Sequence, residues 1–102
     1  MWVIKFGGSI MRNRLSTIIK TLDCIFRANK ISKVIVVPGG GVFADSVRKF
    51  QNDTGVSDAV AHEIATMSLN LTAKAIVTID ERFKEVDTVK FKKEYVPVLL
   101  HC

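Results

Sequence analysis

The sequence predicts an α/β domain around a mostly parallel sheet, and three patterns support this prediction. A short strand pattern at residues 2–6 is followed by a helical pattern at 14–29 and by a wholly apolar run at 33–37. A strand, a helix and a second apolar strand make a βαβ unit, in which the two strands are parallel and the crossover is right-handed. Glycine-rich turns directly follow both strands. We expect a single domain over residues 1–102.

The first half of the chain contains two predicted helices. The first, at 14–29, is predicted from apolar residues at helical spacing, namely Leu15, Ile18, Ile19, Leu22, Ile25 and Phe26. The strand before it, at 2–6, is interpreted as buried, although it contains Lys5. After the second glycine turn, residues 42–50 fit a short helix with Phe43, Val47 and Phe50 on one side, and residues 52–55 form a turn.

The second half is predicted to contain a long helix, a strand, a short helix and a final strand. Ser57 is a residue type that caps helix N-termini, and the helix after it is expected to reach about residue 73. Its expected buried stripe consists of Val60, Ile64, Met67 and Leu71. The remaining elements are expected as a strand at 75–79, a helix at 81–89 capped by Asp80, and a strand at 96–100.

The charge balance favours a small anionic substrate as the partner. The chain carries 15 Lys and Arg residues against 10 Asp and Glu, so its net charge is +5. The basic residues lie in three separate clusters without interleaved aromatic side chains for base stacking, which makes nucleic acid an unfavoured partner. No apolar run is long enough to span a bilayer, and the amino terminus lacks a signal-peptide pattern. We therefore expect a cytoplasmic protein with no membrane partner.

Histidine and cysteine residues do not predict a metal site. His62 lies one turn after Asp58, but a metal needs more ligands, so a core or interface histidine is the favoured interpretation. Cys24 and Cys102 match neither a metal motif nor a CxxC pair and are expected to be reduced and structural.

The first glycine turn, Gly7-Gly8-Ser9, is either a tight turn or a phosphate loop. Glycine lets the backbone approach a ligand closely, and a helix that begins after the turn points free N–H groups at an anion. Lys5 favours the phosphate loop, because a lysine in a buried strand is costly unless its ammonium reaches a charge. The turn does not match the Walker A pattern.

The second turn, Gly39-Gly40-Gly41, is a stronger indication of a ligand loop. Three consecutive glycines carry a large cost in backbone entropy, which is typical of a loop that must contact a ligand. Asp45 and Arg48 follow three residues apart on the predicted helix. They are either an ordinary intrahelical ion pair, or Arg48 is a bidentate clamp for an anionic acceptor.

Together the two turns resemble the amino acid kinase family. The resemblance rests on two motifs, Lys5-x-Gly-Gly-Ser and, after an apolar strand, Gly39-Gly40-Gly41. The segments 38–48 and 58–67 are similar to the archaeal and methylotroph branch, which includes the kinase of methanofuran biosynthesis. The resemblance implies a three-layer sandwich with a mostly parallel sheet. It also implies transfer of the γ-phosphoryl group of ATP, with Mg²⁺, to a carboxylate- or phosphate-bearing acceptor.

The resemblance also implies roles for individual residues. By motif match, Lys5 is the catalytic lysine between donor and acceptor. The phosphates of ATP are assigned to Gly7, Gly8 and Ser9, and the acceptor to Gly39, Gly40, Gly41, Asp45 and Arg48. Family members are about twice as long, so this chain is expected to be a truncated or split amino-terminal half. Its expected partner is a carboxyl-terminal half or a second copy. The alternatives are a non-catalytic nucleotide- or anion-binding module and an assembly subunit.

Overall fold

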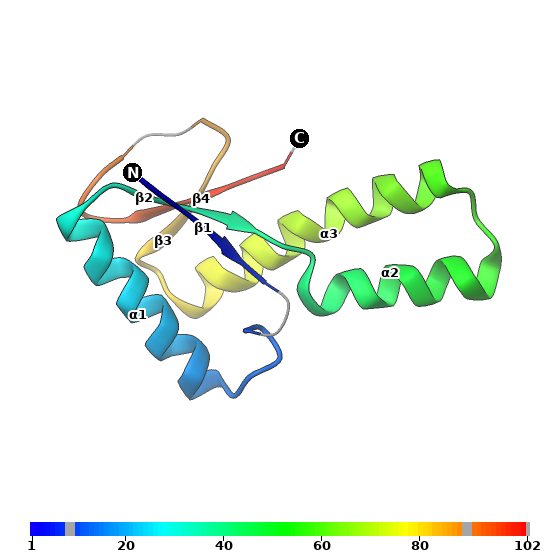
Figure 1. The fold of residues 1–102 in the computed structure, drawn as a ribbon, viewed down its shortest axis with the longest axis horizontal. Helices are drawn as coiled ribbons and strands as arrows, with labels where there is room; N and C mark the ends of the chain where they lie inside the picture. Colours follow the sequence, from blue (N-terminus) through cyan, green and yellow to red (C-terminus); the bar gives the residue numbers. More distant parts are fainter. Residues whose placement is uncertain (8–9, 89–90, 102) are drawn as a thin grey trace.

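The order of helices and strands is that of an α/β protein. The computed structural model describes residues 1–7, 10–88 and 91–101. Within these residues the elements are, in order, β1 (Trp2–Phe6), α1 (Leu15–Ile31), β2 (Val34–Pro38), α2 (Gly41–Thr54), α3 (Asp58–Ile79), β3 (Phe83–Val86) and β4 (Val96–Leu99) (Figure 1). The predicted α/β class is confirmed.

The sheet determines where the two glycine turns lie. Its strand order is β1-β2-β4-β3, and each neighbouring pair is parallel. In the register of β1 with β2, Lys5 pairs with Val37 and Phe6 pairs with Pro38. Because parallel strands end at the same edge of a sheet, the turns after β1 and β2 lie next to each other.

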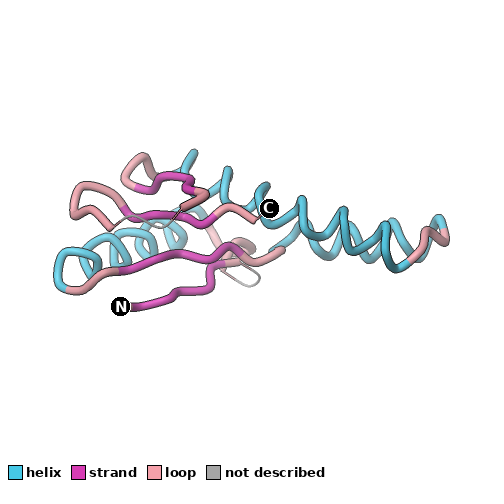
Figure 2. The backbone as a smooth tube through the Cα atoms, turned by 90° about the horizontal axis from the view of Figure 1, so that it is seen from above, coloured by secondary structure: helices cyan, strands magenta, loops and turns pink. Residues whose placement is uncertain are grey.

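One hydrophobic core joins the sheet to α1 and to the carboxyl-terminal part of α3. Alternate residues of β2 and β4 point to this core, because successive side chains of a strand face opposite sides. The largest apolar side chains that are fully buried in this core are Phe6, Leu22, Val34, Val36, Ile76, Phe83, Val96 and Val98. The remainder of α3 and all of α2 form a helical hairpin that projects from the sheet (Figures 1 and 2).

The predicted buried stripe of α3 is wrong. Val60, Met67 and Leu71 are 41%, 67% and 53% exposed. The buried residues are mostly small and lie on another face, or near the sheet: Ala61, Ser68, Thr72, Ala73 and Ile76. Three residues of the predicted stripe, Ile64, Met67 and Leu71, instead line an open groove of about 430 Å³ between α3 and α2. No residue of α2 itself, which lies wholly in the described part of the chain, is buried. The expected association with a second chain stays a prediction.

Two predicted elements of the second half are also wrong. Residues 75–79 complete α3 rather than forming a strand, because Ala73 and Ile76 bury one helical face in the core. Residues 81–89 were predicted as a helix, but they contain β3, since Phe83 is buried beside β4. Asp80 ends α3 instead of starting a helix. Ser57 does cap α3, as predicted: its hydroxyl oxygen accepts a hydrogen bond from the Val60 amide at 3.3 Å.

A buried asparagine closes the amino end of the sheet. The Asn29 amide nitrogen donates to the carbonyl oxygens of Lys92 and Tyr95, at 2.9 and 3.2 Å. Its side-chain oxygen accepts a hydrogen bond from the Val34 amide at 3.1 Å. One side chain thus connects α1, the first residue of β2 and the segment before β4.

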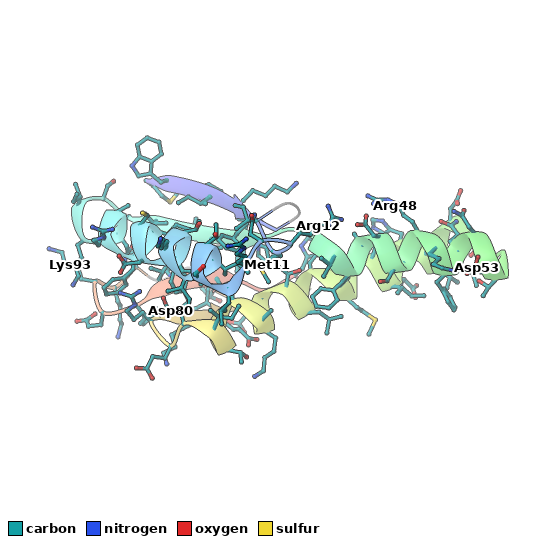
Figure 3. All side chains as sticks on the ribbon, turned by 90° about the horizontal axis from the view of Figure 1, so that it is seen from below. Met11, Arg12, Arg48, Asp53, Asp80 and Lys93 are labelled. Atoms are coloured by element: carbon teal, nitrogen blue, oxygen red, sulfur yellow. The ribbon has the colours of Figure 1, made fainter. Side chains whose placement is uncertain are left out.

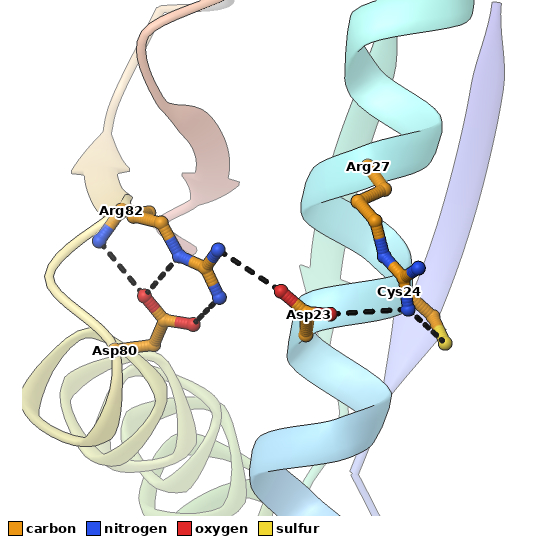
Figure 4. A network of polar contacts seen from close by, with 5 residues as sticks. All are labelled: Asp23, Cys24, Arg27, Asp80 and Arg82. Atoms are coloured by element: carbon orange, nitrogen blue, oxygen red, sulfur yellow. Dashed lines mark hydrogen bonds and ion pairs between the residues drawn. The ribbon is translucent and has the colours of Figure 1, made fainter.

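Arg82, in the connection between the end of α3 and the start of β3, links this connection to α1. The Arg82 guanidinium donates to Asp80 at 2.8 and 3.0 Å and to Asp23 at 3.1 Å, and it lies 4.3 Å from the centroid of the Phe26 ring (Figure 4). Arg27 pairs with Asp23 from the other side. The hydrogen bonds from Arg82 hold the pKa of Asp80 below its ordinary value, although partial burial opposes this, and they raise the pKa of Arg82.

Candidate functional site

The two glycine turns form the walls of an open cleft of about 530 Å³ at the carboxyl ends of β1 and β2. The lining residues are Lys5, Gly7, Ile10, Arg12, Gly39, Gly40, Gly41, Ala44, Asp45 and Arg48. Apart from Gly8 and Ser9, which lie outside the described residues, every residue predicted for the site lines this cleft. The structure thus brings the predicted site residues together, and their chemical roles remain predictions.

The turns approach each other so closely that Gly7 has no room for a side chain. The Gly39 amide donates a hydrogen bond to the Phe6 carbonyl oxygen at 2.7 Å. A Cβ atom added to Gly7 would lie 2.9 Å from the Cα atom of Gly39, a distance that real Cβ atoms essentially never show. The two halves of the predicted site are therefore joined by direct backbone contact.

The second turn leads directly into α2. Gly41 is the first residue of this helix and has a φ of 57°, a left-handed conformation that favours glycine. The buried Thr72 of α3 donates its hydroxyl proton to the Gly40 carbonyl oxygen at 3.3 Å, which holds the turn against the helical hairpin. The first-turn amides of α2 have no partner within the helix, so its positive dipole end lies at the cleft.

The interpretation of β1 as a buried strand is wrong, and this changes the argument for Lys5. β1 is the edge strand of the described sheet, and Lys5 is exposed. Its ammonium therefore does not need a ligand to compensate for burial. The position of Lys5 still favours a ligand. Its Cε atom lies 3.8 Å from where a Cβ atom of residue 39 would be if Gly39 had one. In addition, no carboxylate of the described residues pairs with Lys5. The side chain thus reaches across to the second turn.

Asp45 lies between two arginines at the mouth of the cleft. Its carboxylate forms ion pairs with Arg12, from the loop after β1, and with Arg48, one helical turn further along α2, at 2.7 Å in the second case. The intrahelical pair predicted from the spacing is present. Arg12 was not among the predicted site residues, because nothing in its position along the chain links it to Asp45. Figure 3 shows Arg12 at the junction of the sheet and the hairpin, and Arg48 further out along α2.

The described residues offer no ready-made metal site. Residues 1–7, 10–88 and 91–101 contain no group of three His, Cys, Asp or Glu side chains placed to hold an ion. The only carboxylate in the lining of the cleft, Asp45, is already paired with two arginines. His62 is exposed rather than in the core, and Asp58 accepts a hydrogen bond from Gln51 at 2.8 Å. Cys24 is a free thiol on the surface, not the structural cysteine expected.

The cleft is suited to an anion with more than one charge. Three cationic side chains, Lys5, Arg12 and Arg48, face one carboxylate, and the first turn of α2 adds backbone N–H donors. Guanidinium groups and oriented amides bind phosphate oxygens, and an ammonium stabilises the charge that develops during phosphoryl transfer. The residues thus fit phosphate groups, whereas they do not fit a protein-bound metal ion.

Comparison with known proteins agrees with this chemistry. The chain is 29% identical to the [5-(aminomethyl)furan-3-yl]methyl phosphate kinase of Methanocaldococcus jannaschii over 105 residues, an alignment that covers 98% of the chain and 47% of that kinase. The chain therefore spans about half the length of this curated relative. No helix in the described part is long and apolar enough to cross a membrane. The model of the amino acid kinase family matches residues 1–95, and the protein therefore belongs to the amino acid kinase family.

Proposed function

We propose that this chain supplies the acceptor-binding cleft and one catalytic lysine of an ATP-dependent small-molecule kinase. The observation that carries the proposal is the convergence of Lys5, both glycine turns and Arg48 on one cleft, although they come from three different elements. Membership of a kinase family supports the reaction class. Because the chain spans about half of its curated relative, we propose activity for an enzyme in which a further polypeptide segment supplies the other half.

We propose a role for each of these residues that is compatible with its position. The Lys5 ammonium, which lies over the second glycine turn, neutralises charge on the oxygens between donor and acceptor during transfer. The backbone of Gly7 and its neighbours holds donor phosphates, and the turn at Gly39–Gly41 holds the acceptor. Bound ATP with Mg²⁺ supplies the phosphoryl group and the leaving group. We assign no Mg²⁺ ligand to this chain, because Asp45 is held by two arginines.

The acceptor is proposed to be a small anion bearing a carboxylate or a phosphate. The relative from Methanocaldococcus jannaschii is a kinase of a methyl phosphate, which supports the phosphate alternative here. Arg48 is the proposed clamp for the anionic group, because a guanidinium can donate two parallel hydrogen bonds to it.

The experiment that tests the proposal is Lys5→Ala in the complete enzyme, with Lys20→Ala as the matched control. Lys20 is an exposed lysine of α1 that does not line the cleft. We expect turnover with ATP to fall by at least roughly 10²- to 10³-fold for Lys5→Ala and to stay unchanged for Lys20→Ala. Folding should survive both changes, since both side chains are exposed; circular dichroism would check this. Wild-type turnover in a folded Lys5→Ala enzyme would contradict the proposal.

A further inference from the structure

We infer that Arg12 is a specificity-determining residue: together with Arg48 it forms a two-arginine site for a doubly charged phosphate group, and Asp45 is the internal counter-ion that competes with the phosphate for the two guanidinium groups. This inference rests on the proposed function, because the site lies in the same cleft. It adds a residue from the first loop to the acceptor subsite and assigns Asp45 a role different from direct contact with the acceptor.

The first step of the argument is the charge at the mouth of the cleft. A single carboxylate, Asp45, accepts ion pairs from both Arg12 and Arg48. The trio of Arg12, Asp45 and Arg48 therefore has one unbalanced positive charge, to which Lys5 adds another. As long as no anion is bound, Asp45 offsets the repulsion between the two guanidinium groups, and a bound phosphate can offset it in the same way. The trio thus brings two cations together and leaves a net charge that an anion can neutralise.

The second step is the accessibility of the three side chains. Their exposed fractions are 49% for Arg12, 52% for Asp45 and 73% for Arg48, and all three line the cleft. Ion pairs this exposed contribute little to stability, typically about 0–1 kcal/mol. Because the pairs are weak, an incoming anion can take over hydrogen bonds from the guanidinium groups at small cost. The trio is therefore able to exchange its internal partner for a ligand.

The third step is the match between two guanidinium groups and a phosphate. A carboxylate carries one charge, which a single bidentate arginine already neutralises, so a second arginine adds less for a carboxylate than for a dianion. A phosphate monoester carries nearly two charges at neutral pH and three free oxygens, so it can accept hydrogen bonds from two arginines. Arg48 alone would serve either acceptor. Arg12 adds affinity for phosphate and little for a carboxylate, and for this reason it determines specificity.

A purely structural role of Arg12 makes a different prediction. In that case the Arg12–Asp45 pair only ties the loop after β1 to α2, and removing either partner would have the same effect on the cleft. In the two-arginine site the effects are opposite: loss of Arg12 removes a ligand for phosphate, whereas loss of the Asp45 charge removes a competitor for the arginines. Phosphate affinity therefore separates the two roles.

The experiment is a titration of the ¹⁵N-labelled chain with inorganic phosphate at about pH 8 and constant ionic strength, with acetate titrated in parallel. Binding is followed at the amide signals of Val42 and Phe43 in the first turn of α2. The variants are Arg12→Gln and Asp45→Asn. Arg27→Gln is the matched control, because Arg27 is another exposed arginine that pairs with an aspartate, on α1 and outside the cleft lining.

We expect Arg12→Gln to raise the Kd for phosphate roughly tenfold or more and to change that for acetate by less than about twofold. Asp45→Asn should leave phosphate binding as tight as in the original chain or tighten it, and Arg27→Gln should leave it unchanged. The inference is overturned if the original chain binds no phosphate, if Arg12→Gln binds it normally, or if Arg12→Gln and Asp45→Asn weaken it equally.

Arg12→Lys provides a second variant in case Arg12→Gln does not fold. Lysine keeps the charge and can still pair with Asp45, but it lacks the planar two-donor group of arginine. The preference for phosphate over acetate should therefore fall in Arg12→Lys, and a preference equal to that of the original chain would contradict the inference. The titration requires no phosphoryl transfer, so its failure and that of the Lys5 experiment are independent results.

Discussion

The two ends of the sheet use the same side chains for opposite purposes. At the amino end, Asp80 and Asp23 meet Arg82 and Arg27, so two carboxylates balance two guanidinium groups (Figure 4). At the carboxyl end, a single carboxylate, Asp45, faces two arginines and a lysine across an open cleft. Both clusters consist of arginine and aspartate, and the difference lies in their ratio.

This difference separates a structural cluster from a binding site. Arg82 is surrounded: it donates four hydrogen bonds to two carboxylates and stacks on Phe26. Such a network has no charge left for a ligand. The excess of cations at the other end is costly for an isolated protein and becomes favourable only when an anion binds. A count of charges within each cluster is therefore more informative than the net charge of the chain.

The largest effect on stability is expected for Arg82→Met, which keeps the contact with Phe26 and removes the charge. Asp80, whose side chain is only 10% exposed, would lose its charged partner and keep only the hydrogen bond from the backbone amide of residue 82. We expect the free energy of unfolding in urea to fall by about 2 kcal/mol. Arg27→Met, at a pair that is mostly exposed, should cost less than about 0.5 kcal/mol. Equal losses for the two variants would show that the balanced cluster does not depend on Arg82.

A somewhat smaller loss, combined with an effect on the site, is expected for Gly7→Ala. The added Cβ atom would push against Gly39, so unfolding should require about 1–2 kcal/mol less, and phosphate binding should weaken. Gly55→Ala is the control: Gly55 has a φ of 71° and nothing within 4 Å, so alanine costs about 1 kcal/mol there without touching the cleft. The phosphate titration of the ¹⁵N-labelled chain distinguishes the two variants, because only Gly7→Ala should bind phosphate more weakly. Normal affinity in Gly7→Ala would break the link between the turns and the site.

The smallest effect concerns pH. Because Arg82 lowers the pKa of folded Asp80, this carboxylate stabilises the fold above the unfolded pKa of about 3.9, and the stabilisation is lost as pH falls through the lowered folded value. The difference in unfolding free energy between the original chain and Arg82→Met should stay constant from about pH 7 to 5 and narrow below about pH 4. Urea unfolding at a series of pH values measures this. If this difference in unfolding free energy already narrows between pH 7 and 5, a titratable group other than Asp80 is responsible.

The local patterns of the first half predicted the order of its elements, but residues 52–54, predicted as part of a turn, extend α2. Of the six apolar residues that predicted α1, Ile18, Leu22 and Ile25 are buried, whereas Leu15 and Ile19 are exposed. As predicted, β1 and β2 pair in parallel. In the second half, the apolar run at 75–79 fits a buried helix as well as a strand, and only contacts with the sheet decide between them. The burial of β1 was wrong for a related reason: sequence periodicity does not show which strand lies at the edge.

The site was predictable to the extent that it depends on glycine turns at strand ends. Lys5, Gly7, Gly39–Gly41 and Arg48 line the same cleft because parallel strands end at the same edge. Arg12 was missed because a loop residue reveals its partner only in three dimensions. Asn29 was missed because an asparagine within a helical pattern looks like a surface residue, although it bonds to three backbone groups.

The projecting hairpin of α2 and α3 gives the two sides of the cleft different mechanical attachments. The chain is elongated, with extents of 47 × 30 × 19 Å. Its radius of gyration of 14.5 Å exceeds the radius of gyration of roughly 13 Å expected of a compact domain of this size. Lys5 belongs to the sheet, whereas Arg48 is carried by the hairpin. The hairpin joins the sheet at Gly40 and Gly41 and through α3, which continues into the core. A bend of α3 together with a rotation at these glycines would move Arg48 while Lys5 stayed in place. The angle between the hairpin and the sheet thus sets the distance between Lys5 and Arg48.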